Sequence, residues 1–110
     1  MTPQLYARLL NEQHSLDPNP HVLAFEVLPR RRFQGVYRLM RNGSRTPIFL
    51  IEKKTGLVFR STKAGRPSGM PISTLQSAVE TLQTKMRVSL ANLPPERLVA
   101  WFATNRPLGV

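Results

Sequence analysis

The sequence lacks cysteine, which excludes disulfides, cysteine-ligated zinc and thiol chemistry. It is also poor in acid, because six Asp and Glu stand against 16 Lys and Arg, giving a formal net charge of +10. No apolar run approaches the roughly 20 residues that cross a bilayer. The N-terminus has no basic start followed by an apolar stretch, so a secretory signal is not expected. We therefore expect an intracellular protein without a membrane partner, located in the cytoplasm, or in the host cytoplasm if the protein is viral.

Motifs for catalysis are missing as well. The scattered acids do not form the carboxylate cluster that two-metal nucleases and polymerases need. His14 and His21 are seven residues apart, do not form a His-x-His pair and have no third metal ligand in the sequence. The loop 63–69 lacks the lysine-hydroxyl end of a Walker motif, and we expect it to contact a backbone phosphate as a basic loop. The sequence predicts no catalytic residue, no metal site and no cofactor, and so no enzyme.

The pattern of apolar residues predicts one two-layer α+β domain over residues 1–110. Thr2 and Pro3 are typical of a helix start, and this predicts an N-terminal helix within 1–16. Ser73 and Gln76 match a capping box, and Pro95 can open a last helix, so two helices are expected in 72–106. Between the helices, a four-stranded antiparallel sheet is expected in 21–64, and 64–71 is expected to be a loop. The four strand-like segments are 21–28, 33–41, 47–53 and 57–63, joined by connections short enough for a meander.

The positive charge is concentrated in the segment 29–66. Glu52 is the one acid there, so eleven cations minus one acid account for the whole +10, and the flanking parts balance. A charge that served solubility alone would be spread over all elements, whereas a local basic surface is typical of a polyanion binder. We predict that these cations form a nucleic-acid-binding surface: Arg30, Arg31, Arg32, Arg38, Arg41, Arg45, Lys53, Lys54, Arg60, Lys63 and Arg66.

A meander predicts how these cations are distributed, since alternate turns lie at the same end of the sheet. Arg30–Arg32 should then lie beside Lys53 and Lys54, with Arg41, Arg45, Lys63 and Arg66 at the other end. Alternation along the strands places Phe33, Tyr37, Leu39, Leu57 and Phe59 on one face, which we expect to pack on the helices. The opposite face would carry Val36, Arg38, Met40, Val58, Arg60 and Thr62 as a stacking surface for unpaired bases. The same face would suit a dimer interface. Residues 48–51 are apolar on both faces, which leaves open a homo-oligomer formed through the sheet.

The segment 56–67, Gly-Leu-Val-Phe-Arg-Ser-Thr-Lys-Ala-Gly-Arg-Pro, resembles small phage-encoded proteins of unknown function. In these a hairpin ends in Gly-x-Val-Tyr-Lys and is followed by a basic, proline-containing loop. The resemblance extends upstream to Tyr37-Arg38 and Phe49-Leu50 and covers about a third of the chain. Phe59-Arg60 replaces Tyr-Lys here, and the C-terminal helices lie outside the match. The resemblance implies a viral origin and a similar hairpin, and it implies no activity.

Together these patterns predict a module that binds nucleic acid through the phosphate backbone and largely without reading base sequence. Single-stranded DNA or RNA is favoured over duplex, because the expected helices carry few cations and none is typical of a major-groove recognition helix. The alternative is a viral structural or interaction protein, either an assembly factor or a binder of an acidic host protein. Electrostatic steering would serve that role equally well.

Overall fold

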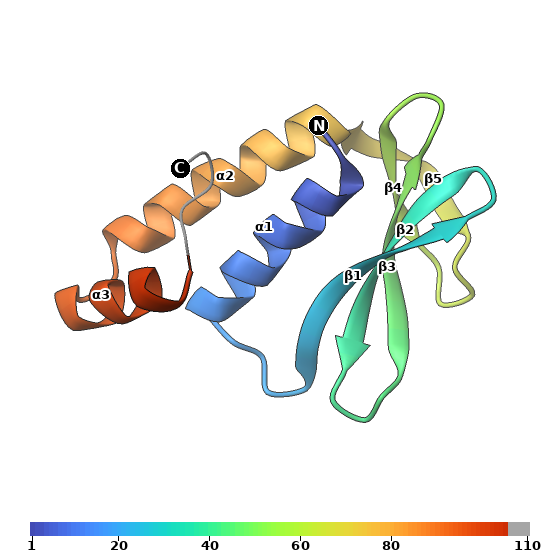
Figure 1. Ribbon diagram of the computed structural model, residues 1–110. Helices are drawn as coiled ribbons and strands as arrows, with labels where there is room; N and C mark the ends of the chain where they lie inside the picture. The colour runs from blue at the N-terminus through green and yellow to red at the C-terminus, as the bar shows by residue number, and fades with distance from the viewer. Residues whose placement is uncertain (106–110) are drawn as a thin grey trace.

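The computed structural model describes residues 1–105, in which three helices and five strands follow one another along the chain (Figure 1). The helices are α1 (Pro3–Leu16), α2 (Leu75–Ala91) and α3 (Pro95–Thr104). The strands are β1 (Val22–Arg30), β2 (Phe33–Met40), β3 (Arg45–Glu52), β4 (Leu57–Ser61) and β5 (Pro67–Thr74). The predicted α+β class is confirmed. The helical segment predicted to reach residue 106 ends at Thr104, and Arg106 lies outside the described residues.

The sheet is an antiparallel meander in the order β1-β2-β3-β4-β5, so the prediction of four strands is wrong. The fifth strand begins at Pro67, inside the segment expected to be a loop, and pairs with the edge that β4 would otherwise leave free. Val58 pairs with Ser73 and Arg60 with Ser68, so β5 bulges between these two pairs. Proline and glycine are tolerated at sheet edges and bulges, and this is why a segment rich in both still forms a strand.

The two long helices begin at threonine caps. The Thr2 side chain accepts a hydrogen bond from a backbone amide of the first turn of α1, as the sequence predicts. For α2 the prediction is one residue early. Thr74 is the cap and accepts from the Ser77 amide at 3.1 Å, while Ser73 pairs with β4. The Gln76 side chain donates to Glu80 instead of closing a capping box. The sheet register therefore decides which of the two hydroxyl residues starts the helix.

Helices α1 and α2 cover one face of the sheet, and the core lies between the two layers (Figure 1). Val36 and Val58 are fully buried in this core. Val36 pairs with Phe49, whose ring contacts the Tyr6 ring of α1 at a centroid distance of 5.7 Å. The even-numbered positions of β2 and β4 therefore face the helices, and the predicted assignment of faces is wrong. The surface expected to stack bases cannot do so, because its two valines are buried beneath the helices.

Aromatic residues cover the far face of the sheet. The Phe33 and Phe59 rings pack edge to face at a centroid distance of 5.9 Å, and Leu50 pairs directly with Phe59. Leu50 is only 1% exposed although it points away from the helices, and Tyr37 is also buried. Both faces of β3 are thus covered within one chain, which accounts for its run of apolar residues. A homo-oligomer stays a prediction.

The outer edge of β1 is protected by a side chain of α1. The Asn11 amide donates to the Phe25 carbonyl at 3.0 Å and accepts from the Phe25 amide at 2.8 Å. One side chain thereby satisfies both backbone groups that an edge residue would otherwise leave unpaired.

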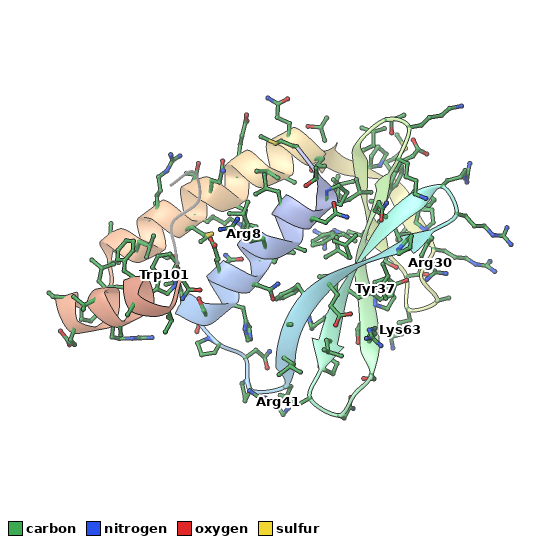
Figure 2. The ribbon with its side chains drawn as sticks, in the orientation of Figure 1. Arg8, Arg30, Tyr37, Arg41, Lys63 and Trp101 are labelled. Atoms are coloured by element: carbon green, nitrogen blue, oxygen red, sulfur yellow. The ribbon has the colours of Figure 1, made fainter. Side chains whose placement is uncertain are left out.

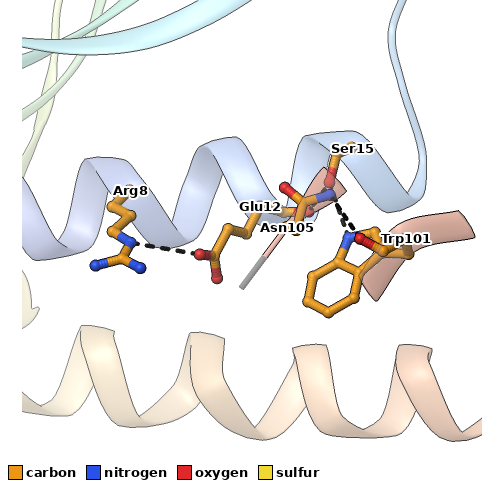
Figure 3. A network of polar contacts seen from close by, with 5 residues as sticks. All are labelled: Arg8, Glu12, Ser15, Trp101 and Asn105. Carbon is orange, nitrogen blue, oxygen red and sulfur yellow. Dashed lines mark hydrogen bonds and ion pairs between the residues drawn. The ribbon is translucent and has the colours of Figure 1, made fainter. Parts of the chain in front are cut away.

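The C-terminal helix α3 returns to the end of α1 (Figure 3). The Trp101 indole donates to the Ser15 hydroxyl at 3.0 Å, and the Asn105 amide donates to the Trp101 carbonyl. On the neighbouring turns of α1, Arg8 pairs with the buried carboxylate of Glu12 at 3.4 Å. These contacts belong to the helical layer, and no cation of segment 29–66 takes part in them.

Among residues 1–105, no helix combines the length and the apolarity needed to cross a membrane.

Candidate nucleic-acid interface

Ten of the eleven predicted cations are exposed, and Arg38 is half-buried. Arg38 lies on the helix-side face, and its Nε is buried without a hydrogen-bond partner. Arg60 pairs with Phe49 and so shares that face, although its side chain reaches solvent. These two residues therefore do not form a common surface with the arginines of the turns.

The turn between β1 and β2 consists of Arg31 and Arg32 alone, because Arg30 pairs directly with Phe33. Arg31 has a φ of 31°, the only positive φ at a non-glycine residue within 1–105. Two-residue hairpin turns require such a conformation, and glycine or asparagine usually supplies it. An arginine is therefore held in backbone strain at the tip of the sheet.

The turn between β3 and β4 lies beside this arginine turn, as the meander predicts. The Lys53 ammonium donates to the Arg31 carbonyl at 2.9 Å, and the Lys53 amide donates to the Arg32 carbonyl at 2.9 Å. Lys54 follows in the same turn and is exposed. Cations more than twenty residues apart in the sequence thus come together at one end of the sheet.

Arg30, the last residue of β1, is held in place by Tyr37 of β2, and both side chains are labelled in Figure 2. The Arg30 Nη1 donates to the Tyr37 hydroxyl at 2.8 Å. The Tyr37 ring lies over Gly35, where a Cβ would come within 2.6 Å of the ring. The same Nη1 end of the Arg30 guanidinium lies over Gly65 of the β4–β5 turn, so closely that a side chain at Gly65 would collide with it. Two glycines therefore make room for the Tyr37–Arg30 pair.

The β4–β5 turn is itself ordered by backbone bonds. The Thr62 amide donates to the Arg66 carbonyl at 2.8 Å, and the Thr62 carbonyl accepts from the Gly65 amide at 2.9 Å. The Thr62 hydroxyl accepts from the Arg66 amide at 3.1 Å. The sequence predicts that this basic loop contacts a backbone phosphate. In the structure, hydrogen bonds order the loop, and its Gly65 packs against Arg30.

A cleft of about 820 Å³ opens between the β1–β2 turn and the β4–β5 turn. Among residues 1–105 its walls contain four arginines and no acid. We call it the arginine cleft, and it is lined by Pro29, Arg30, Arg31, Arg32, Phe33, Gly65, Arg66 and Pro67.

The position of Arg66 corrects the predicted distribution of cations, which placed it at the opposite end from Arg30–Arg32. In a flat meander the β4–β5 turn would lie with the β2–β3 turn. The sheet is strongly twisted (Figure 1), as antiparallel sheets with right-handed strands are. The twist carries Gly65 and Arg66 across the far face to Arg30.

Few of these cations have acidic partners. Within residues 1–105 the ion pairs are Arg8–Glu12 and Arg45–Glu26, the latter at 2.9 Å. Glu26 and Arg45 lie on β1 and β3 and meet across β2, which partly neutralises the end of the sheet away from the arginine cleft. Glu52 instead accepts a hydrogen bond from the Thr55 hydroxyl. Within residues 1–105, ten of the eleven predicted cations form no ion pair, and six of these ten lie at the arginine cleft or on the adjoining β3–β4 turn, as Lys53 and Lys54.

Sequence reasoning missed Tyr37, Phe33 and Gly65 as parts of this site. The sequence predicts Tyr37 and Phe33 on the helix side of the sheet, whereas in the structure Tyr37 bonds Arg30 and Phe33 lines the arginine cleft. Arg32 lies over the Phe33 ring at 5.7 Å from its centroid, a cation–π contact that orients a second arginine of the cleft. The sequence feature that could have indicated their role is the presence of two aromatic residues, Phe33 and Tyr37, within an arginine-rich hairpin.

Comparison of the chain with protein-family models, with curated proteins and with solved structures finds no match.

Proposed function

We propose that this protein binds nucleic acid through the phosphate backbone, without reading base sequence. The observation that carries the proposal is the arginine cleft, where four arginines surround one cavity with no acid among its lining residues 29–33 and 65–67. Guanidinium groups offer planar, always-charged donors that fit phosphate oxygens in pairs. Like charges held this close repel one another, so a bound polyanion would stabilise the arrangement.

The remaining exposed cations extend this surface beyond the cleft. Lys53 and Lys54 adjoin it on the β3–β4 turn, and Lys63 precedes it on the β4–β5 turn. No predicted cation of segment 29–66 lies on a helix, which supports backbone contact over major-groove reading.

A salt titration tests the proposal. Binding of a fluorescent oligonucleotide is measured by anisotropy at several salt concentrations, and log affinity should fall with log salt by about 0.7 per contacted phosphate on single strands. The double variant Arg31→Gln/Lys53→Gln should bind more weakly, with a slope shallower by about 1.4. No binding at low salt, or a slope near zero, would contradict the proposal.

The matched control is Lys85→Gln/Arg97→Gln, which removes two exposed cations from the helical layer. It should bind nearly as the unmodified protein does. Arg8 is unsuitable as a control because it pairs with the buried Glu12 carboxylate. Equal losses in both double variants would indicate diffuse net charge and no localised site.

The alternative partner, an acidic protein, is distinguished in the same assay. Poly-glutamate at equal charge concentration should compete poorly, since carboxylates separated by a flexible chain do not match the phosphate spacing. Competition as effective as that of unlabelled oligonucleotide would favour the interaction-protein hypothesis.

A further inference from the structure

We infer that the arginine cleft is a discrete binding site for one phosphate of a single-stranded nucleic acid. Arg30 is the hydrogen-bond donor that is already held in position there. For this reason single strands are preferred over duplex. This inference rests on the proposed function and adds to it which strand form is bound and at which residues.

The first support is the fixed position of the Arg30 guanidinium. An exposed arginine normally loses rotamer freedom when it binds, which weakens affinity. Here the hydrogen bond to Tyr37 and the contact with Gly65 hold the group before any ligand arrives. The Tyr37 bond occupies Nη1. Nε and Nη2 of Arg30 make no hydrogen bond within residues 1–105, so their N–H donors remain to bind phosphate oxygens.

The second support is that donors stand on both walls of the cleft. Arg31 and Arg32 belong to the β1–β2 turn, while Arg66 belongs to the β4–β5 turn. Each turn is tied down, the first by Lys53 on its carbonyls and the second by Thr62 on the Arg66 amide. A phosphate between the two turns can therefore accept hydrogen bonds from arginines of both turns at once. A flat basic patch would not allow this.

The third support is the concave shape. A volume of about 820 Å³ falls within the range of about 300–1,000 Å³ typical of small-ligand pockets, enough for one nucleotide unit. The phosphates of a duplex lie on a convex, stiff cylinder and would meet only the rim of the cleft. An extended single strand can bend a phosphate into it.

Three variants test the cleft. Tyr37→Phe keeps the net charge and the ring over Gly35 but releases Arg30, whereas Arg30→Gln and Arg66→Gln each remove one cation. The probes are a labelled oligo(dT) 12-mer and a 12-base-pair duplex at one salt concentration. Arg41→Gln serves as the comparison for an exposed cation of the β2–β3 turn, outside the cleft, and circular dichroism checks that every variant folds.

The unmodified protein should bind the single strand more tightly than the duplex. Arg30→Gln should weaken single-strand binding about tenfold, and Tyr37→Phe about threefold, as expected when one charged hydrogen bond is lost or disordered. Arg66→Gln should resemble Arg30→Gln, and Arg41→Gln should cost less. The salt slope of Tyr37→Phe should stay unchanged, because no charge is removed. In NMR, the Gly65 amide should shift when inorganic phosphate is added.

Failure of this inference differs from failure of the proposed function. If the protein binds nucleic acid but Arg30→Gln and Arg66→Gln lose no more affinity than Arg41→Gln, the cleft is not the phosphate-binding site. The proposal that the protein binds nucleic acid then still stands. Tighter binding of the duplex would overturn the preference for single strands. If Tyr37→Phe does not fold, the test of the cleft rests on Arg66→Gln. The Arg66 side chain is exposed, so its replacement should not disturb folding. Absence of any binding at low salt would overturn both.

Discussion

Replacing Arg31 with glycine should stabilise the protein although it removes a side chain from the candidate site. A residue with a side chain at the φ of 31° is disfavoured by about 1–2 kcal/mol, because its Cβ approaches the following carbonyl. Glycine avoids this contact but increases the entropy lost on folding by about 0.5–1 kcal/mol. The bond from Lys53 is made to the Arg31 carbonyl and survives the change. The net expectation is a gain of up to about 1.5 kcal/mol.

The neighbouring variant Arg32→Gly is the matched control. It removes the same charge from the same turn, so changes in charge repulsion largely cancel between the two variants. Arg32 has no positive φ to relieve, and it loses its contact with the Phe33 ring. It should therefore be destabilised by about 1 kcal/mol, from the glycine entropy and the lost cation–π interaction.

Urea denaturation measures both changes. The midpoint should rise for Arg31→Gly and fall for Arg32→Gly, with the slope of the free energy of unfolding against urea unchanged in each. Both variants should bind oligonucleotide more weakly, and the salt slope should become shallower by about 0.7 in each case. An Arg31→Gly protein no more stable than Arg32→Gly would refute the assignment of strain to this turn. Unchanged binding in both would remove the turn from the interface.

The other predictions concern the scaffold. Leu82→Ala should lower the free energy of unfolding by about 2–5 kcal/mol, because Leu82 is buried in the core on the helix side of the sheet and the change leaves a cavity. Oligonucleotide affinity measured on the folded fraction should not change, and a folded variant that lost binding would contradict the separation of scaffold and site. Asn11→Ala should cost about 1–3 kcal/mol by leaving both Phe25 backbone groups unpaired. Light scattering should also show more association through the uncovered β1 edge, and unchanged stability and scattering would contradict the capping role of Asn11.

The fifth strand could not be predicted from local sequence patterns. Pro67, Gly69 and Pro71 are typical of a loop in any reading of isolated sequence. Whether such a segment pairs depends on a free strand edge nearby, and β4 supplies one. The same register takes Ser73 into the sheet and leaves Thr74 as the helix cap. The extra strand and the shifted helix cap both result from strand pairing between segments distant in the sequence. Local residue preferences do not predict such pairing.

The assignment of sheet faces was wrong for a related reason. Alternation shows that Phe33 and Tyr37 share a face and that Val36 lies opposite, and this holds in the structure. Alternation does not show which face meets the helices when both are apolar. Here the smaller valines pack against α1 and α2, while the aromatic rings fold over the far face of a twisted sheet.

By itself the sequence determined the class of fold, the order of the first strands, the cap of α1 and the location of the charge within 29–66. These follow from spacing and composition, which act over a few residues. The meeting of Lys53 with the arginine turn followed from the meander, since alternate short turns must share an end. Only the tertiary structure decided that Arg66 joins Arg30. The twist accumulates from strand to strand, so the β4–β5 turn reaches Arg30 through the geometry of the whole sheet and the two glycines that admit the Tyr37–Arg30 pair.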